Sequence, residues 1–191
     1  MRVGVLALQG DFAAHARALA AAGCAAVEVR KPADLEGLDA MVLPGGESTT
    51  MLKSLEQDGF AAQLRNFVSH RPTLATCAGT ILLAQRVRAP EQASLGVLDV
   101  TVRRNAYGRQ RESSVRMAEV APQYQEALGA QRLEAVLIRA PQLSELGPGV
   151  DVVAWEGDQP LLVRQGKILA ATFHPELSAD SPMHRWFARM R

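Results

Sequence analysis

Cys77 has the sequence context of a nucleophile. The short apolar segment 73–76 precedes it, and the small residues Ala78 and Gly79 follow it. We expect a strand that turns sharply into a helix here, which pushes the side chain at the turn into the crevice at the carboxyl end of the strand. A helix amino terminus lowers the pKa of a thiol, and its free N–H groups can bind an oxyanion. A lone cysteine in an apolar context is otherwise a core residue, and Cys24 fits that description.

His174 has the context of a general base that could serve this nucleophile. It follows the apolar segment 168–173, which we expect to be a strand, and Pro175 comes next. Proline keeps the residue before it out of the helical region, so His174 should stay extended and Glu176 should point the same way. A nucleophile, a base and a carboxylate that orients the base form a catalytic triad. The other histidines are expected to be solvated or packed side chains: His15, His70 and His184.

A glycine-rich segment could supply the matching anion site. Residues 44–50 read Pro-Gly-Gly-Glu-Ser-Thr-Thr and follow the apolar segment 39–43. Gly45 and Gly46 allow positive φ and a close approach of a ligand to the backbone, so their N–H groups could bind an oxyanion or a carboxylate. The spacing of a phosphate-binding loop is missing. A pair of glycines is by itself also compatible with an ordinary turn.

Residues 103–111 carry four arginines: Arg103, Arg104, Arg109 and Arg111. Two interpretations stay open for this segment, namely a solvated basic face and the recognition of a carboxylate or a partner. The net charge of +1 and the aromatic content of 5% argue against a nucleic-acid surface. Histidine, cysteine and carboxylate spacings typical of zinc or iron sites are missing from the sequence, so we predict no metal.

Length and composition indicate one globular domain over residues 1–191. Apolar residues make up 48% of the chain and charged residues 21%, which excludes a disordered protein. Two cysteines cannot form a disulfide scaffold. The first apolar run is too short for a signal peptide, and no run reaches the ~18 residues of a membrane span. We therefore predict a cytoplasmic protein with reduced thiols.

The elements that must position these residues follow an α/β pattern. In the first half, we predict strands at 3–8, 26–30, 39–43 and 73–76, and helices at 12–22, 48–57, 60–70 and 78–86. In the second half, we predict strands at 97–103, 114–120, 133–139, 150–155, 161–165 and 168–173, and a last helix at 181–191. The pattern predicts a central, mostly parallel sheet flanked by helices, with an antiparallel extension.

With these elements in place, the chain resembles the class I, or triad-type, glutamine amidotransferases almost from end to end. Within them it is most similar to the glutaminase subunits of pyridoxal 5′-phosphate synthase. The resemblance rests on six segments: Gly-Val-Leu-Ala-Leu-Gln-Gly at 4–10, Leu-Pro-Gly-Gly-Glu-Ser-Thr-Thr at 43–50, Thr-Cys-Ala-Gly at 76–79, Arg-Asn at 104–105 with Tyr-Gly-Arg-Gln at 107–110, Ile-Arg-Ala-Pro at 138–141, and Phe-His-Pro-Glu-Leu at 173–177.

The resemblance implies a flavodoxin-like, three-layer α/β glutaminase fold. It also implies that Cys77 attacks the side-chain amide of L-glutamine, that His174 shuttles the proton and that Glu176 orients His174. Gly46 and Ala78 would supply the N–H groups of the oxyanion hole. The matched glutamine-binding positions are Gly46, Glu47, Ser48, Arg104, Ile138 and Arg139. No cofactor is implied, and the ammonia would pass to a pyridoxal 5′-phosphate synthase subunit for vitamin B6 biosynthesis.

Three other functions compete with this one. The first is a glutaminase of another amidotransferase, such as the one in histidine biosynthesis, and the segments at 46–49 and 107–110 argue against it. The second is a redox-sensing or chaperone-like protein, which would need a reactive Cys77 but neither His174 nor Glu176. The third is a noncatalytic regulatory module, for which an intact triad has no use.

Overall fold

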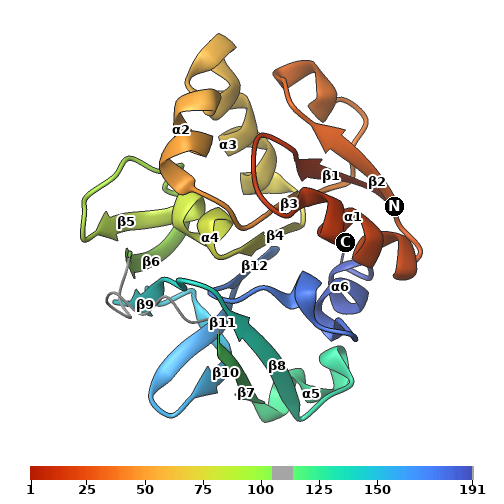
Figure 1. Ribbon diagram of the computed structural model, residues 1–191, viewed down its shortest axis with the longest axis vertical. Coiled ribbons are helices and arrows are strands. Elements are labelled where there is room, and N and C mark those ends of the chain that lie inside the picture. Colours follow the sequence, from red (N-terminus) through yellow and green to blue (C-terminus); the bar gives the residue numbers. More distant parts are fainter. Residues whose placement is uncertain (105–113, 191) are drawn as a thin grey trace.

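The computed structural model describes residues 1–104 and 114–190. Nine strands form its large sheet: β1 Arg2–Leu6, β2 Ala25–Val29, β3 Ala40–Leu43, β4 Thr73–Thr76, β7 Ser114–Val120, β8 Arg132–Leu137, β10 Asp151–Glu156, β11 Gln159–Gln165 and β12 Ile168–Ala171. Their order in space is β2-β1-β3-β4-β12-β11-β10-β7-β8 (Figure 1). The first five strands are mutually parallel, and β11, β10, β7 and β8 continue the sheet with antiparallel pairs. The predicted parallel sheet with an antiparallel extension is confirmed.

Side chains alternate between the two faces of this sheet, because successive residues of a strand point in opposite directions. In β3, Val42 faces a core that includes Leu19, Met183 and Phe187, while Leu43 faces the opposite core. One core is covered by α1 Phe12–Ala21, α5 Pro122–Leu128 and α6 Pro182–Phe187. The other is covered by α2 Ser48–Leu55, α3 Phe60–His70 and α4 Ala78–Leu83. The result is a three-layer α/β fold (Figure 1).

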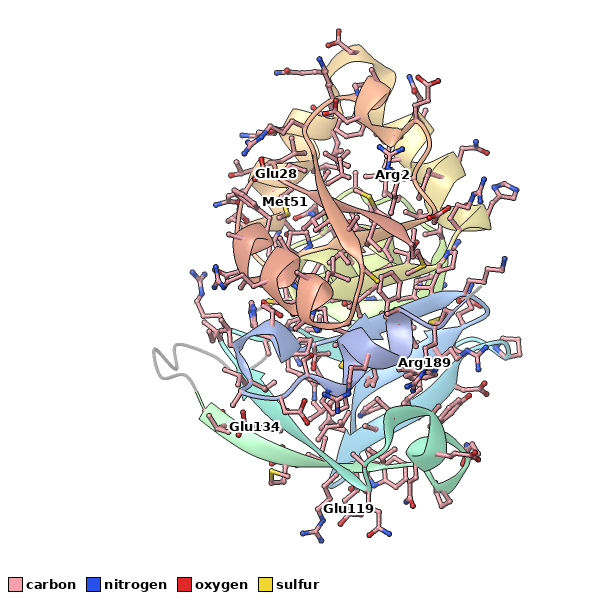
Figure 2. The ribbon with its side chains drawn as sticks, turned by 90° about the vertical axis from the view of Figure 1, so that its right-hand side faces the viewer. Arg2, Glu28, Met51, Glu119, Glu134 and Arg189 are labelled. Atoms are coloured by element: carbon pink, nitrogen blue, oxygen red, sulfur yellow. The ribbon has the colours of Figure 1, made fainter. Side chains whose placement is uncertain are left out.

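The surface and the interior of these layers differ in chemistry as the composition predicts. Figure 2 shows Glu119 of β7 pointing away from the ribbon, and its side chain is 60% exposed. Met51 of α2, labelled in the same view, is fully buried between its helix and the sheet. No helix in the described ranges is long and apolar enough to cross a membrane.

One predicted helix is too long. We predicted a helix over residues 78–86, but α4 ends at Leu83 and the chain continues as the strand β5 Ala84–Arg88. Residues 78–83 are buried throughout, and the burial continues to Ala84 before the exposed residues of β5 begin. The apolar run therefore gave no sign in the sequence that the helix ends at Leu83. β5 pairs in parallel with β6 Leu98–Arg103, which pairs with β9 Gln142–Ser144 in a second sheet. Pairing with β6 overrides local helix propensity.

Other differences concern short elements. The sequence analysis did not include the helix α5, which begins at Pro122, or the three-residue strand β9. The last helix, α6, covers Pro182–Phe187 rather than residues 181–191. The remaining predicted strands and helices are present with bounds shifted by at most two residues.

Candidate active site

Two neighbouring parallel strands bring Cys77 and His174 to the same edge of the large sheet. β4 and β12 pair in register up to Thr76 and Ala171, and both candidate residues follow these strand ends. The Cys77 N–H donates to the Ala171 carbonyl at 2.9 Å, and the His174 N–H donates to the Val136 carbonyl of β8, also at 2.9 Å. Carboxyl ends of parallel strands are where ligands bind in α/β folds. The predicted nucleophile and base therefore share one crevice.

Cys77 occupies the sharp turn that the sequence predicts between β4 and α4. Its backbone lies at φ 45° and ψ −103°. Residues other than glycine adopt such a conformation at an energetic cost, and it is characteristic of a strained turn that carries a nucleophile. The Sγ atom lies 3.9 Å from the Ile138 carbonyl oxygen. Ala78 begins α4, so its N–H has no partner within the helix. Cys24, by contrast, is buried in the core next to α1, as predicted.

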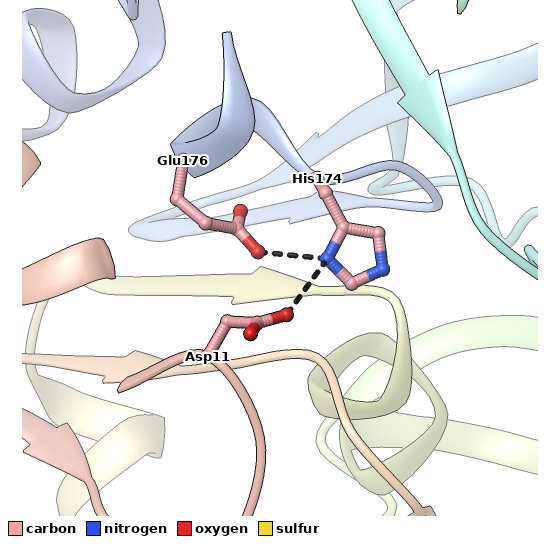
Figure 3. Close-up of side chains that lie close together, drawn as sticks. All are labelled: Asp11, His174 and Glu176. Atoms are coloured by element: carbon pink, nitrogen blue, oxygen red, sulfur yellow. Dashed lines mark hydrogen bonds and ion pairs between the residues drawn. The ribbon is translucent and has the colours of Figure 1, made fainter. Parts of the chain in front are cut away.

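His174 is paired with Glu176 as the triad requires. The Nδ1 atom of His174 lies 2.7 Å from Oε1 of Glu176, and both residues are buried (Figure 3). The expected reason for this pairing was wrong, because Pro175–Leu177 forms a 3-10 turn rather than an extended segment. His174 itself, at φ −110° and ψ 84°, stays outside the helical region, as the following proline demands. The turn brings the carboxylate back onto the ring.

The protonation of His174 depends on opposing effects. Burial lowers its pKa, whereas hydrogen bonds to Cys77 and Glu176 and the negative charge of both groups raise it, with a net value of about 10. An imidazolium is therefore the form present at neutral pH. This cation lies beside the sulfur of Cys77.

A second carboxylate, Asp11, faces the same nitrogen of the ring as Glu176 (Figure 3). Its Oδ2 atom is 3.9 Å from His174 Nδ1, and its side chain is 51% exposed. One nitrogen or oxygen atom from each of the side chains of Asp11, His174 and Glu176 lies within 4.8 Å of the other two. Because Nδ1 already hydrogen-bonds the buried Glu176, the exposed Asp11 contributes charge at longer range. The sequence analysis did not identify Asp11 as a site residue.

A cavity of about 450 Å³ opens beside Cys77 and His174. Volumes of this order suit a small-molecule ligand. Its wall contains all six predicted glutamine-binding residues, namely Gly46, Glu47, Ser48, Arg104, Ile138 and Arg139. Four further residues were not predicted to line it: Gln9, Asp11, Ile81 and Pro141. Glu176 lies behind His174 and does not belong to the wall.

The loop that contains Gly45 and Gly46 packs directly against His174. A methyl group on Gly45 would lie 2.3 Å from Cε1 of His174, so only glycine permits this approach. The Gly45 carbonyl oxygen rests against Gly10, where a methyl group would lie 1.7 Å from it. The side chain of Gln9 accepts the Glu47 N–H at 2.9 Å. The turn after β1 thus holds the glycine loop from the outside.

Glu47 has a structural partner for each carboxylate oxygen. It caps α2 by accepting the N–H groups of Thr49 at 3.2 Å and Thr50 at 2.8 Å, and Arg104 Nη2 lies 3.3 Å away. Partial burial alone would raise the pKa of Glu47, but the N–H groups of Thr50 and Thr49 outweigh it and lower the pKa to about 2. Its carboxylate is thereby fixed as an anion beside Arg104.

The comparisons with known proteins agree with this geometry. The SNO glutamine amidotransferase family matches residues 5–191. The chain belongs to this family. Pyridoxal 5′-phosphate synthase subunit PdxT of Koribacter versatilis is 50% identical over 100% of this chain and 95% of that protein. The PdxT subunit of Thermus thermophilus is 52% identical over 98% of this chain and 96% of that protein.

Solved structures place the chain in the same group. A crystal structure of a glutamine amidotransferase superposes with a TM-score of 0.87 at 49% identity, covering 97% of this chain and 96% of that one. A glutamine amidotransferase from Thermotoga maritima shares the fold, with a TM-score of 0.62 at 18% identity over 97% of this chain and 80% of that one. The class I glutamine amidotransferase fold that the sequence implied is confirmed.

In this family member, Gln92 supports the site without having been predicted. Its Oε1 atom accepts from Arg104 Nη1 at 2.6 Å, from Ser48 Oγ at 3.1 Å and from Thr49 Oγ1 at 3.2 Å. Arginine can only donate, so the atom facing it must be the amide oxygen. Gln92 lies before β6 in a segment with no local motif, and only the fold brings it to Arg104. Of the arginine-rich segment, Arg103 and Arg104 are described, whereas the predicted motif residues at 105 and 107–110 lie outside the described residues.

Proposed function

We propose that the chain hydrolyses L-glutamine to L-glutamate and ammonia through Cys77, His174 and Glu176. The observation that carries this proposal is the hydrogen-bonded pair of His174 and Glu176 beside Cys77, at the wall of a cavity of about 450 Å³. The thiolate attacks the side-chain amide carbon, and the carbonyl oxygen becomes an oxyanion that the N–H groups of Gly46 and Ala78 are proposed to hold.

His174 then gives its proton to the amide nitrogen, the C–N bond breaks and ammonia leaves a glutamyl thioester on Cys77. A water molecule attacks the thioester carbon while His174 takes one of its protons. Collapse of the second tetrahedral intermediate expels the thiolate and yields glutamate. Glu176 holds His174 in orientation and stabilises its cationic form throughout.

Arg104 and Arg139 are the proposed anchors of the glutamine carboxylate, because both line the cavity with guanidinium groups that can bind a carboxylate through paired hydrogen bonds. Gly46, Ser48 and Ile138 would complete the binding site through polar or backbone atoms. Glu47 is proposed to act through Arg104, since the N–H groups of α2 already occupy its carboxylate. Residues 1–191 would form a single glutaminase domain.

The ammonia is proposed to pass to a pyridoxal 5′-phosphate synthase subunit, for vitamin B6 biosynthesis. The full-length relatives from Koribacter versatilis and Thermus thermophilus carry that subunit name at 50% and 52% identity, which supports this partner over a synthase of histidine biosynthesis. The reaction needs no cofactor on this chain. A reducing compartment would keep Cys77 as a free thiol, in line with a cytoplasmic location.

The test is glutamate release by the purified chain, measured with and without the pyridoxal 5′-phosphate synthase subunit. We expect turnover in the complex, and Cys77→Ala should abolish it without changing binding to the partner. Complexes that bind but release no glutamate above the Cys77→Ala background would contradict the proposed activity. A redox or chaperone-like protein would show that result while retaining a reactive Cys77.

A further inference from the structure

A buried polar cluster lies behind the triad, on the side away from the cavity. It consists of His15 of α1, Thr76 of β4, Glu176 and His184 of α6, and all four side chains are buried. Three separate elements and the turn after β12 therefore bring polar groups to one point in the core. Buried polar groups are costly unless they are paired, so this cluster requires an explanation.

The contacts run in a chain away from the catalytic histidine. One oxygen of Glu176, Oε1, faces His174 at 2.7 Å. The other, Oε2, has no aligned hydrogen bond among the described residues, and His15 Nε2 lies 3.2 Å from it. The same Nε2 atom is 3.1 Å from Thr76 Oγ1. On the far side, His15 Nδ1 is 2.9 Å from His184 Nε2, and His184 Nδ1 hydrogen-bonds Ser181 Oγ.

Two proton arrangements satisfy the histidine pair, and the carboxylate selects between them. In the first, both rings carry their proton on Nε2. His184 then donates to His15 Nδ1, Ser181 donates to His184 Nδ1, and the Nε2 proton of His15 lies on the side of Glu176. In the second, both rings donate away from Glu176. In that arrangement the lone pair of His15 Nε2 is directed at Thr76 Oγ1 and lies close to a carboxylate oxygen 3.2 Å away, which is repulsive. An ionised Glu176 therefore favours the first arrangement.

We propose that His15 is a positioning residue for the glutaminase reaction: with its proton on Nε2, 3.1 Å from Thr76 Oγ1 and 3.2 Å from Oε2 of Glu176, it keeps that carboxylate aimed at His174. In this tautomer the Nδ1 atom of His15 accepts from His184 Nε2, and His184 Nδ1 accepts from Ser181 Oγ. The proposal rests on the proposed function for its kinetic consequences, but not for the tautomer itself.

The charges around the cluster fit this role. Burial, together with the charges of His184 and His174, lowers the pKa of His15 well below its usual range, and burial lowers that of His184 to about 4. Both rings are neutral at neutral pH, and the positive charge stays on His174, where the reaction uses it. The carboxylate groups that face His174 are Glu176 at 2.7 Å and the exposed Asp11 at 3.9 Å. Of these two carboxylates, Glu176 also contacts His15, with 3.2 Å between its Oε2 atom and His15 Nε2.

The kinetic test compares His15→Leu, His15→Gln and the control Leu19→Ala in the complex with the synthase subunit. Glutamine at position 15 can place an amide N–H near the position of Nε2, whereas leucine cannot donate. Leu19 is a fully buried residue of the same helix, so its truncation tests for a purely structural effect. We expect His15→Leu to lower kcat by about 10- to 100-fold with little change in KM, the size expected when a catalytic group is misplaced by ~1 Å.

The pH profile separates positioning from stability. Without the N–H of His15, Glu176 is held less firmly against His174, so the pKa of His174 should fall and the alkaline limb of kcat should move down by about one pH unit. His15→Gln should recover most of both effects, and Leu19→Ala should change neither. An alkaline limb of His15→Leu that coincides with that of Leu19→Ala would overturn the proposal.

Nitrogen NMR of the wild-type chain gives a second test, which needs neither a folded variant nor glutaminase activity. Two-bond correlations assign the protonated nitrogen of each imidazole ring, and we expect His15 to carry its proton on Nε2. A proton on Nδ1 would overturn the proposal whatever the kinetics show. A wild-type complex without glutaminase activity would instead contradict the proposed function and leave the tautomer result standing.

Discussion

Burial and the two partners of His174 have opposite effects on the charge of its ring. Burial alone would make the ring neutral, yet contacts with Cys77 and Glu176 keep it cationic, with a pKa of about 10. The same partners define its direction, since Nδ1 is held at 2.7 Å by Glu176 and the other nitrogen is left for the reaction. Charge and orientation therefore come from the same two contacts.

His174 should accordingly be an imidazolium at pH 8, as read from the NMR shifts of its ring in the free chain. Because the pKa lies above the ordinary 6.5, protonation of His174 stabilises the fold fully below about pH 6.5 and loses this effect as the pH rises through about 10. Cys77→Ala removes one of the raising contacts, so the pKa of His174 should fall in that variant. A neutral His174 ring at pH 8 in the wild type contradicts the assigned charge state.

Arg104 and Arg139 should contribute more to binding than to chemistry. Lysine cannot reproduce the paired hydrogen bonds of a guanidinium, so Arg104→Lys and Arg139→Lys should each raise KM more than they lower kcat. Gln92→Leu, which removes the acceptor of Arg104, should raise KM by less than Arg104→Lys. Steady-state kinetics in the complex measures these values, and an unchanged KM in both arginine variants would reassign them to a partner surface.

At the level of elements, local pattern was enough for the site residues that stand at strand ends. The apolar run before Cys77 and the small residues after it predicted β4 and the start of α4 correctly. The run before His174 likewise predicted β12. In both cases the chemistry follows from a change of secondary structure that is visible within ten residues.

Contacts between distant segments could not be predicted in the same way. His15 and Thr76 are 61 positions apart, and Gln92 is 44 positions from Ser48, so no spacing reveals either pair. The 3-10 turn at Pro175–Leu177 and the strand β5 were not predicted either, because tertiary contacts rather than local propensity determine them. Cys77, His174 and Glu176 could be proposed as a triad from the sequence because each has a local signal, while the residues that contact them from distant segments have none.

Glu47 should stabilise α2 as its amino-terminal cap. Glu47→Ala should lower the free energy of unfolding by about 1 kcal/mol at pH 7, a typical value for the loss of a cap. Its pKa is about 2 rather than 4.5, so its contribution is complete above about pH 4.5 and disappears as the pH falls through about 2.

Urea unfolding of the wild type and of Glu47→Ala at pH 7 and pH 3 measures this contribution, and the difference between the two proteins should shrink at pH 3. Ser54→Ala, in the same helix but away from its amino terminus, serves as the control and should stay within about 0.5 kcal/mol of the wild type. A difference for Glu47→Ala that is equal at both pH values would assign the effect to something other than the carboxylate.

In the molecule as a whole, loops from both halves of the chain meet at one edge of the sheet. The cavity wall takes Gln9 from the turn after β1, Gly46 from the loop after β3, Arg104 from the end of β6 and Ile138 from the loop after β8. The turn that contains Gln9 and Gly10 rests on the Gly45 carbonyl, and the trans peptide places the Gly46 N–H on the opposite side. A partner that moves this turn would therefore reorient a proposed oxyanion donor.

We predict that the chain alone is a weak glutaminase and that the synthase subunit raises its rate about tenfold or more. The loss of one oxyanion donor costs ~3 kcal/mol of transition-state stabilisation, on the order of a hundredfold in rate, so a rotated peptide at Gly45 and Gly46 suffices as a switch. Glutamate release at saturating glutamine, titrated with the synthase subunit, measures the effect. A free chain at full rate, unresponsive to a subunit that binds it, would exclude this switch and leave the triad intact.

The most direct test of the central claim is the covalent labelling of the complex with a thiol-directed glutamine analogue, followed by peptide mass spectrometry. We expect one label on Cys77 and none on the buried Cys24. Excess L-glutamine should protect Cys77, and Glu176→Gln should slow the labelling because it weakens the His174 cation. Labelling of Cys24 instead, or labelling of Cys77 that L-glutamine does not slow, would contradict a glutaminase site built on Cys77, His174 and Glu176.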